Sequence, residues 1–322
     1  GALVSRDGRF VYVKRDAGYA PNAFEKYTEE QLNAGAGRKP YGEYFDAEGN
    51  SLWTRQEPPY LTKISPHGKY LMTERDEMAD QADLVVVSGK DGSTLWERPR
   101  GFLAAEFVGD DKVALYSNAR FYLFDAATGD TLRTVDLLPT FRQIGLRNIA
   151  HARISSSKDG RKIALILRML GSKSGVISLN SQGDILWARG DLKWASFIQL
   201  SESGGILFLN AHPCGLIDNT SGKLVWAQEF SFSWIKNIRV NSKYIVVSGT
   251  VPPEYDATGM SGHGAVIFLL GKGSKVQDKY SISEAVVGAS IGTSTKELTL
   301  ILVKKGEGTV GFSKSILGKE EK

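Results

Sequence analysis

Short hydrophobic runs bounded by glycine, serine, asparagine or charged residues recur along the whole chain. Three of the clearest are residues 84–87, 244–247 and 298–303, which are rich in valine, isoleucine and leucine. β-Branched residues in such short runs, with turn-forming residues nearby, are typical of β-strands rather than of amphipathic helices. The pattern therefore predicts an all-β chain built from many short strands.

Two turn motifs alternate between these runs. The first is a serine followed three residues later by glycine and then by a β-rich run, as in Ser65-Pro-His-Gly68-Lys-Tyr. The second is a glycine turn that leads into Leu-Trp, as in Gly89-Lys-Asp-Gly-Ser-Thr-Leu-Trp96. Each motif predicts a hairpin, so one repeat contains four antiparallel strands, which we call a, b, c and d. Copies of the serine motif begin at Ser5, Ser65 and Ser157, with looser copies at 201–208 and 241–247. Copies of the tryptophan motif end at Trp53, Trp96, Trp187 and Trp226, and in a weaker copy Arg133 takes the tryptophan's place.

The two motifs divide the chain into seven units. Dividing 322 residues by seven gives 46 per unit, which fits a four-stranded propeller blade. We therefore predict one domain over residues 1–322, an all-β, seven-bladed β-propeller. In the sixth unit Lys275-Val-Gln277 replaces Leu-Trp, and the seventh lacks a recognisable strand d, so the way in which the ring closes is left open. The predicted blades are 3–55, 63–98, 105–135, 152–189, 195–228, 235–279 and 284–315.

Both motifs resemble those of known propeller families. The Asp-x-x-Gly-x-x-Leu-Trp ending resembles the tryptophan motif of quinoprotein-type propellers, and the hairpin at 65–70 resembles the corresponding turn of WD-repeat-like propellers. In the quinoprotein family this tryptophan packs between blades. The resemblance therefore implies a structural role for its four copies here, Trp53, Trp96, Trp187 and Trp226.

The same resemblance bears on cofactors and localisation. Catalytic quinoproteins are usually longer, with eight blades, a calcium-binding set of residues and often adjacent cysteines. This chain is shorter and has one cysteine, Cys214, so it resembles the non-catalytic branch and no cofactor is expected. Because quinoprotein-like propellers are mostly exported in bacteria, we expect a periplasmic or extracellular surface protein whose leader or anchor is missing from this sequence. One free cysteine is equally compatible with the cytoplasm.

The enlarged loops are all predicted to lie on one face, which carries the b–c and d–a connections. Insertions on one face of a repeat protein often form its binding surface, although loops also lengthen where nothing constrains them. In the first insertion, Thr28-Glu-Glu-Gln-Leu32 predicts a short helix. The enlarged loops are 15–40, 75–81, 170–174, 211–215 and 251–262, together with the d–a connection 137–150.

Aromatic and histidine residues on this face are the candidates for binding. Trp194 and Trp234 occupy equivalent positions at the start of strand a, where an aromatic ring suits a sugar or an extended peptide; blade packing is the alternative. Three histidines fall on the same face, but no fixed spacing supports a metal site with Cys214, Glu254 or Asp256. His67 is expected on the other face, in solvent. The candidate partner-binding residues are Phe102, Arg142, Arg147, His151, Trp194, His212, Trp234, Tyr255 and His263.

Composition and charge say less about the fold than about which classes of partner the protein binds. Hydrophobic residues make up 42% of the chain and charged residues 24%, as in folded globular proteins. The net charge of +4 is too small to suggest nucleic acid. Residues 133–173 contain nine basic and two acidic residues, which suits an acidic partner, lipid headgroups or simply a solvated surface. No run is long enough for a membrane-spanning helix, so membrane association is expected only through a missing anchor or a partner.

These observations predict a non-enzymatic scaffold or binding protein. It would recognise another protein or an extended polymer on the face that carries the b–c and d–a loops. No phosphate-binding loop, zinc-protease motif or nucleophile elbow is present in the sequence. Two alternatives stay open: a propeller lyase or hydrolase that uses His151, His212 and His263, and a receptor for a small ligand or glycan in the channel mouth.

Overall fold

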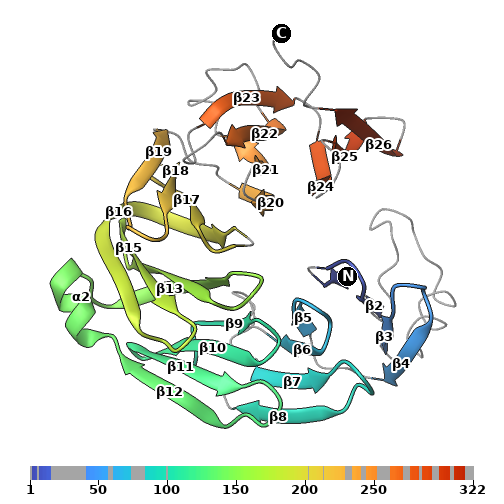
Figure 1. Ribbon diagram of the computed structural model, residues 1–322, viewed down its shortest axis with the longest axis horizontal. Helices are drawn as coiled ribbons and strands as arrows, with labels where there is room; N and C mark the ends of the chain where they lie inside the picture. The colour runs from blue at the N-terminus through green and yellow to red at the C-terminus, as the bar shows by residue number, and fades with distance from the viewer. Residues whose placement is uncertain are drawn as a thin grey trace, which may run out of the picture. The chain divides into compact units, whose positions relative to one another are not determined.

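The computed structural model is almost entirely β-structure (Figure 1). By the density of their internal contacts, the residues form two compact units: unit 1 is 1–138 with 181–183, and unit 2 is 139–180 with 184–322. The structure describes residues 2–5, 7–15, 41–56, 61–73, 84–98, 101–201, 203–212 and 214–228, and the backbone of the strands at 234–240, 244–251, 262–270, 276–282, 285–291, 297–304 and 308–315.

Unit 1 contains three four-stranded antiparallel sheets, and in each one the strands lie side by side in chain order. The first sheet is β1 (Ala2–Val4), β2 (Val11–Arg15), β3 (Tyr41–Phe45) and β4 (Ser51–Gln56). The second is β5 (Leu61–Ile64), β6 (Tyr70–Thr73), β7 (Leu84–Ser88) and β8 (Thr94–Arg98). The third is β9 (Ala104–Val108), β10 (Lys112–Ser117), β11 (Arg120–Asp125) and β12 (Thr131–Asp136).

Unit 2 contains three further antiparallel sheets, of seven, four and three strands. The first is β13 (Ile149–Ser156), β14 (Lys162–Met169), β15 (Lys173–Asn180), β16 (Ile185–Leu200), β17 (Ile206–His212), β18 (Cys214–Asp218) and β19 (Leu224–Gln228). The second is β20 (Trp234–Val240), β21 (Tyr244–Val251), β22 (Gly262–Leu270) and β23 (Val276–Ile282). The third is β24 (Ala285–Ile291), β25 (Glu297–Lys304) and β26 (Gly308–Ser315).

The seven-stranded sheet arises because β16 continues from one repeat into the next. Its first part pairs with β15 as far as Lys193, and its last part pairs with β17. Lys193 belongs to both pairings, because it lies opposite Lys173 of β15 and His212 of β17, and a register shift follows between residues 193 and 197 in the β16–β17 pairing. One 16-residue strand thus serves as strand d of one repeat and strand a of the next, where the sequence predicts two separate strands.

The serine motif forms the a–b hairpins as predicted. In the β5–β6 turn, the buried Ser65 hydroxyl accepts a hydrogen bond from the Tyr70 N–H at 3.1 Å. Gly68 has a φ of +73°, and a Cβ atom at this position would overlap the ring of Phe10 and the hydroxyl of Tyr44. The glycine is therefore required both by its backbone conformation and by the close packing of the neighbouring hairpin.

At Trp53, Trp96 and Trp187 the tryptophan motif docks a strand d on the c–d turn of the following repeat. Trp96 donates from Nε1 to the Ala126 carbonyl at 2.9 Å, and Arg98 donates to the Gly129 carbonyl at 2.7 Å. Gly129 has a φ of +74°, and its ideal Cβ would lie 2.8 Å from the indole of Trp96. These contacts confirm the predicted packing role of Trp96; the side chain of Trp226 lies outside the described residues. The arrangement recurs at Trp53 and Arg55 on the turn of Gly89 and Gly92, and at Trp187 and Arg189 on the turn of Asn219 and Gly222.

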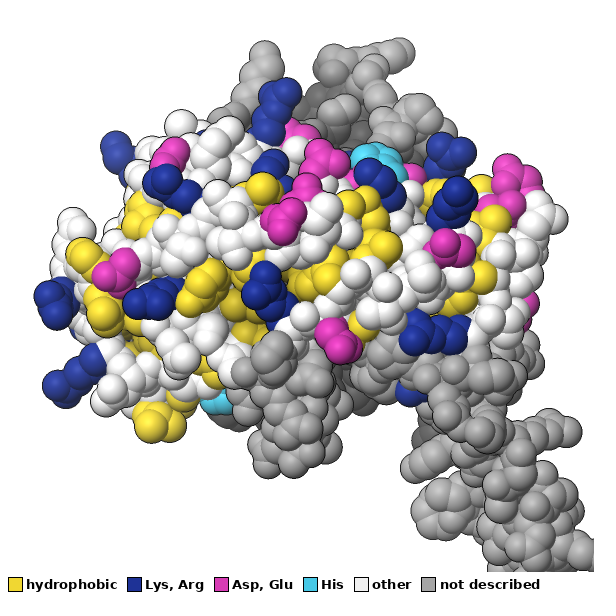
Figure 2. Space-filling view, turned by 90° about the horizontal axis from the view of Figure 1, so that it is seen from below, with side chains coloured by type: hydrophobic (Ala, Val, Ile, Leu, Met, Phe, Trp, Pro, Cys, Tyr) yellow, Lys and Arg dark blue, Asp and Glu magenta, His cyan; other side chains and the backbone are white. Residues whose placement is uncertain are grey.

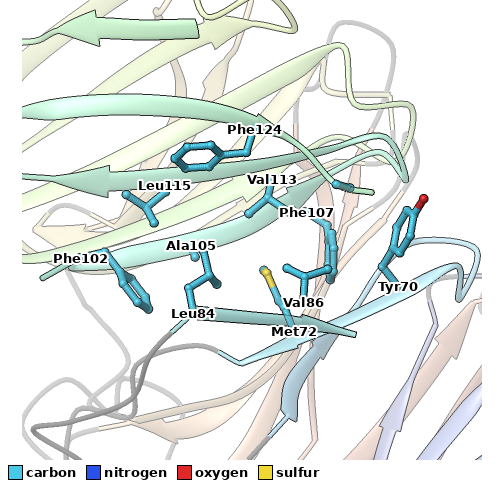
Figure 3. Packing of buried hydrophobic residues seen from close by; sticks show 11 residues of the cluster. Tyr70, Met72, Leu84, Val86, Phe102, Ala105, Phe107, Val113, Leu115 and Phe124 are labelled. Carbon is cyan, nitrogen blue, oxygen red and sulfur yellow. The ribbon is translucent and has the colours of Figure 1, made fainter. Parts of the chain in front are cut away.

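The largest side chains of one core cluster come from the second and third sheets of unit 1 (Figure 3). Met72 and Val86 lie on β6 and β7, and face Ala105, Phe107 and Val113 from β9 and β10. All five are buried. Alternate side chains of β6 and β7 enter different core clusters, with Met72 and Val86 in this one and Leu71 and Val87 in another, so both faces of the second sheet are buried.

A short helix, α2 (Leu138–Ile144), interrupts the strands in the d–a connection. The Asp136 carboxylate accepts from the Leu138 N–H at 3.0 Å, Pro139 lies in the first turn, and Gly145 ends the helix with a φ of +68°. The sequence analysis left this helix unassigned, whereas the helix predicted at Thr28–Leu32 lies outside the described residues. Among the described residues, no helix is long and apolar enough to cross a membrane.

His67 contacts a carboxylate in addition to solvent. Its Nδ1 lies 2.5 Å from Asp110 Oδ2, and its backbone N–H donates to Asp110 Oδ1 at 3.1 Å. Burial raises the pKa of Asp110, but hydrogen bonds from Ser65 and His67 outweigh it, so the pKa of this carboxyl lies below its usual value. Two neighbouring a–b turns are therefore joined by a carboxylate that must be ionised.

Asp110→Asn is expected to reduce the free energy of unfolding more at about pH 6 than at about pH 3. Because the folded protein lowers the pKa of Asp110, its contribution is complete above the unfolded value of about 3.9 and is lost as the pH falls through the folded value. Urea unfolding of both proteins at the two pH values measures the difference. An equal loss at both values would show that the charge of Asp110 contributes nothing.

Candidate interaction surface

One end of the sheet β13 to β16 combines a b–c turn with the junction inside β16. The turn is residues 170–172, and the junction is residues 193–197. Lys173 pairs with Lys193 across β15 and β16, and the Trp194 N–H donates to the Ser172 carbonyl at 2.7 Å. These contacts hold the turn and the junction against each other. We call this end of the sheet, with the adjoining α2 connection, the loop-end surface; it comprises residues 138–153, 166–175 and 192–197.

Trp194 is the most unusual residue of the loop-end surface. Its φ is +54°, a region that bulky side chains rarely adopt, and 54% of its surface is exposed. Hydrogen bonds fix the backbone on both sides of this residue. The Ser172 carbonyl accepts from the Trp194 N–H, and the buried Ser174 hydroxyl accepts from the Ala195 N–H at 3.1 Å. The fold therefore holds a large aromatic ring in solvent at a cost in backbone strain.

Trp194→Gly is expected to unfold at a higher temperature than Trp194→Ala, with a free energy of unfolding larger by about 1 kcal/mol. Both variants remove the ring, but glycine adopts a positive φ without steric cost. Thermal and urea unfolding of the two variants measures this difference. An alanine variant as stable as the glycine variant would mean that residue 194 carries no backbone strain.

Leu170 provides a second exposed apolar side chain on the b–c turn. It is 80% exposed, and Gly171 follows it with a φ of +109°. Figure 2 shows that hydrophobic side chains lie among charged side chains of both signs on one face of the protein. Four other exposed leucines belong to the repeat itself, since each stands one residue before the motif tryptophan or Arg133: Leu52, Leu95, Leu132 and Leu186. Leu170 and Trp194 do not occupy that repeated position, so they are specific to this end of the sheet.

The α2 connection brings further basic residues to the same surface. Ile144 lies against β16, because a Cβ on Gly190 would overlap the Ile144 carbonyl oxygen. The Lys173 amine lies close to Gly145 at the end of α2, at 2.6 Å from an ideal Cβ there. Arg142 and Arg147, both exposed, stand on either side of Gly145. The positive charges of α2 and of β15 therefore adjoin the exposed tryptophan.

The structure places the predicted site residues in different surroundings. Arg142, Arg147, His151 and Trp194 are exposed on the loop-end surface. Phe102 is only 3% exposed and belongs to the core cluster of Figure 3, so it packs between sheets instead of facing a ligand. His212, Trp234 and His263 lie in β17, β20 and β22, for which the backbone alone is described at these positions. Tyr255 lies outside the described residues.

Five residues of this surface were not among the predicted binding residues. Leu170 and Lys193 were assigned no role of their own, and Arg153, Arg168 and Lys173 were counted only as part of a basic stretch. Arg168 pairs with His151 across β13 and β14. Serine and glycine in residues 170–174 indicated a loop. Nothing in the sequence indicated that β16 would place Trp194 beside that loop. The long β16 strand is what brings the separate segments together.

An open pocket of about 620 Å³ lies beside this surface, between α2, β16 and the β18–β19 turn. Its charged groups are paired with each other: Arg189 donates to both carboxylate oxygens of Asp191, at 2.8 and 2.6 Å, and to the Gly222 carbonyl. The Arg189 guanidinium holds the pKa of Asp191 below its usual value. Among the described residues, no cluster of three histidine, cysteine or acidic side chains could hold a metal ion.

The backbone has the fold of a β-propeller. It is similar to the β-propeller domain of Cps50 (Swd1) from Myceliophteria thermophila, with a TM-score of 0.54 and 15% identity over 97% of this chain and 94% of that one. It is also similar to the Dos1 propeller, with a TM-score of 0.55 and 13% identity over 97% and 77% of the two chains. Dihydro-heme d1 dehydrogenase NirN is a third example, with a TM-score of 0.55 and 11% identity over 86% and 59%.

These similarities establish the fold and leave the function open. The sequence matches no family model and no curated protein. Two of the three neighbours are named as propellers, and the third is named as a dehydrogenase. A propeller therefore occurs in proteins of different function, and the argument for function has to come from the residues of this chain.

Proposed function

We propose that this chain is a non-enzymatic, seven-bladed β-propeller scaffold that binds another protein through the loop-end surface. Trp194 carries the proposal, since a fully fixed, strained backbone presents a large aromatic ring to solvent. Tryptophan is enriched among the residues that dominate binding energy at protein interfaces. Leu170 supplies a second apolar contact, and loops on a rigid β-scaffold are the usual place for recognition.

The finer parts of the proposal rest on the sequence. Seven blades follow from the seven repeated units, with β16 shared between the fourth and the fifth. The tryptophan motif supports membership of the non-catalytic branch of quinoprotein-like propellers. The same resemblance supports an exported protein, in the periplasm or at the extracellular surface.

Affinity capture with matched variants tests the binding role. The wild-type protein, Trp194→Ala, Leu170→Glu and Leu132→Ala serve as baits, and captured proteins are compared by mass spectrometry. Leu132 is a suitable control because it is a half-exposed hydrophobic residue on β12, in unit 1. We expect a partner that the wild type and Leu132→Ala retain, and that Trp194→Ala and Leu170→Glu recover at least about tenfold less.

The comparison requires that all four baits are folded to the same extent. Circular dichroism and thermal unfolding of the four baits provide the check, and Leu170→Glu is the safer variant because its side chain is 80% exposed. If all four baits capture the same proteins in the same amounts, the loop-end surface is not the binding site.

A further inference from the structure

We propose that the loop-end surface binds an extended acidic segment of the partner, which also carries a large apolar side chain. This inference rests on the proposed function and specifies the chemistry of its partner. The first observation is the distribution of charge. The segments 138–153, 166–175 and 192–197 contain no aspartate or glutamate. Their six basic residues are Arg142, Arg147, Arg153, Arg168, Lys173 and Lys193.

The opposite end of the same sheet has mixed charge. The β13–β14 turn contains Lys158 and Arg161 together with Asp159, and Arg161 lies 3.5 Å from the Asp159 carboxylate. The β15–β16 turn contains Asp184. The structure thus separates a basic stretch of sequence into one end with both signs and one end whose six basic residues have a single adjoining carboxylate, Asp191, which is paired with Arg189. That separation makes the loop-end surface complementary to a negatively charged ligand.

Two lysines on the loop-end surface occupy paired positions on neighbouring strands. Lys173 and Lys193 are directly opposite in the register of β15 and β16, and both are exposed. Like charges directly opposite on neighbouring strands repel each other. The nearest carboxylate along the chain, Asp191, is already paired with Arg189 at 2.6 Å. A carboxylate of a bound partner placed between the two lysines would remove the repulsion.

The apolar side chains define the rest of the ligand. Leu170 and Trp194 lie at the same strand ends as the lysine pair, and their exposed fractions are 80% and 54%. An apolar anchor surrounded by charged residues is the usual arrangement of a peptide-binding hot spot. A lipid surface fits less well, because stable membrane binding requires more apolar area than one tryptophan and two leucines, Leu138 and Leu170, expose here. An acidic peptide with a leucine or an aromatic residue satisfies both parts of the surface.

Selection from random peptides displayed on phage tests this inference directly. Immobilised wild-type protein is the bait, and an enriched peptide is then synthesised with a fluorescent label and titrated by anisotropy. We expect the enriched peptides to combine aspartate or glutamate with a large apolar residue. Raising NaCl from about 50 mM to about 500 mM should weaken their binding several-fold, because exposed charge pairs are screened.

Two pairs of variants identify the residues responsible. Trp194→Ala, and Lys173→Gln combined with Lys193→Gln, should each weaken the labelled peptide at least about tenfold. Lys158→Gln combined with Arg161→Gln removes the same number of charges from the opposite end of the sheet and should leave the affinity unchanged, as should Leu132→Ala.

Four results would overturn the inference: no enriched peptide, enriched peptides without acidic residues, equal affinity in the lysine double variant, or binding only to vesicles that contain an anionic lipid. The proposed function fails separately, since it is tested by whether Trp194 and Leu170 are needed for partner capture. The Trp194→Ala variant could lose a partner whose binding depends neither on salt nor on Lys173 and Lys193. That result would support the scaffold role and contradict the proposal of an acidic ligand.

Discussion

Gly129→Ala should lower the free energy of unfolding by about 3 kcal/mol. Alanine at a φ of +74° is strained, and its Cβ would lie 2.8 Å from the indole of Trp96. That indole cannot easily move away, because its Nε1 is bound to the Ala126 carbonyl and Arg98 is bound to the Gly129 carbonyl. Urea unfolding of the variant and of the wild type measures the loss.

Gly49→Ala is the matched control for this substitution. Gly49 also lies in a c–d turn with a positive φ, of +82°, but a Cβ there meets no atom within 4 Å. Its substitution should therefore cost only the backbone strain, about 1–2 kcal/mol. If the two variants lose the same stability, the tryptophan does not dock tightly on the following turn, and the structural role of the motif is wrong.

Phe107→Ala should have the largest effect on stability, a loss of about 3–5 kcal/mol. Phe107 is 1% exposed and lies where side chains of the second and third sheets of unit 1 meet (Figure 3). Removing the ring leaves a cavity lined by Met72, Val86 and Val113, which are themselves held in strands and cannot collapse fully. Chemical unfolding monitored by circular dichroism gives the change.

Leu132→Ala provides the comparison for the core substitution. Leu132 is 50% exposed on β12, so its truncation should cost about 1 kcal/mol or less. A Phe107 variant with a loss as small as that of Leu132→Ala would contradict the packing of the two sheets. The comparison separates burial from the general effect of losing a large side chain.

The repeats were predictable because they depend on local chemistry. Serine and glycine at fixed spacing close the hairpin by themselves, as Ser65 and Gly68 show. The docking role of Trp96 followed from a resemblance, and its hydrogen bond to Ala126 confirms it. For these elements the residues that set the structure are close together in sequence, or recur with every unit.

The features that escaped prediction depend on contacts between segments. The sequence of residues 185–193 has no local signal that the strand continues past this point. The continuation of β16 to Leu200 could therefore not be predicted. Phe102 stands seven residues before the turn residue Gly109, just as Trp194 stands seven before Ser201. Phe102 is nevertheless buried in the core between two sheets, whereas Trp194 is exposed. Helix α2 was accessible in principle, because Asp136, Pro139 and Gly145 stand at the positions that start and end helices.

Photocrosslinking at the two ends of β14 tests the central claim most directly. A benzophenone amino acid replaces Leu170, which follows the strand on the loop-end surface, or Arg161, which precedes it at the opposite end; both side chains are at least 80% exposed. The account predicts a crosslinked partner protein from position 170 and none from position 161, and loss of that crosslink when Trp194→Ala is added. Equal crosslinking from both positions, or a partner captured only from position 161, would contradict it.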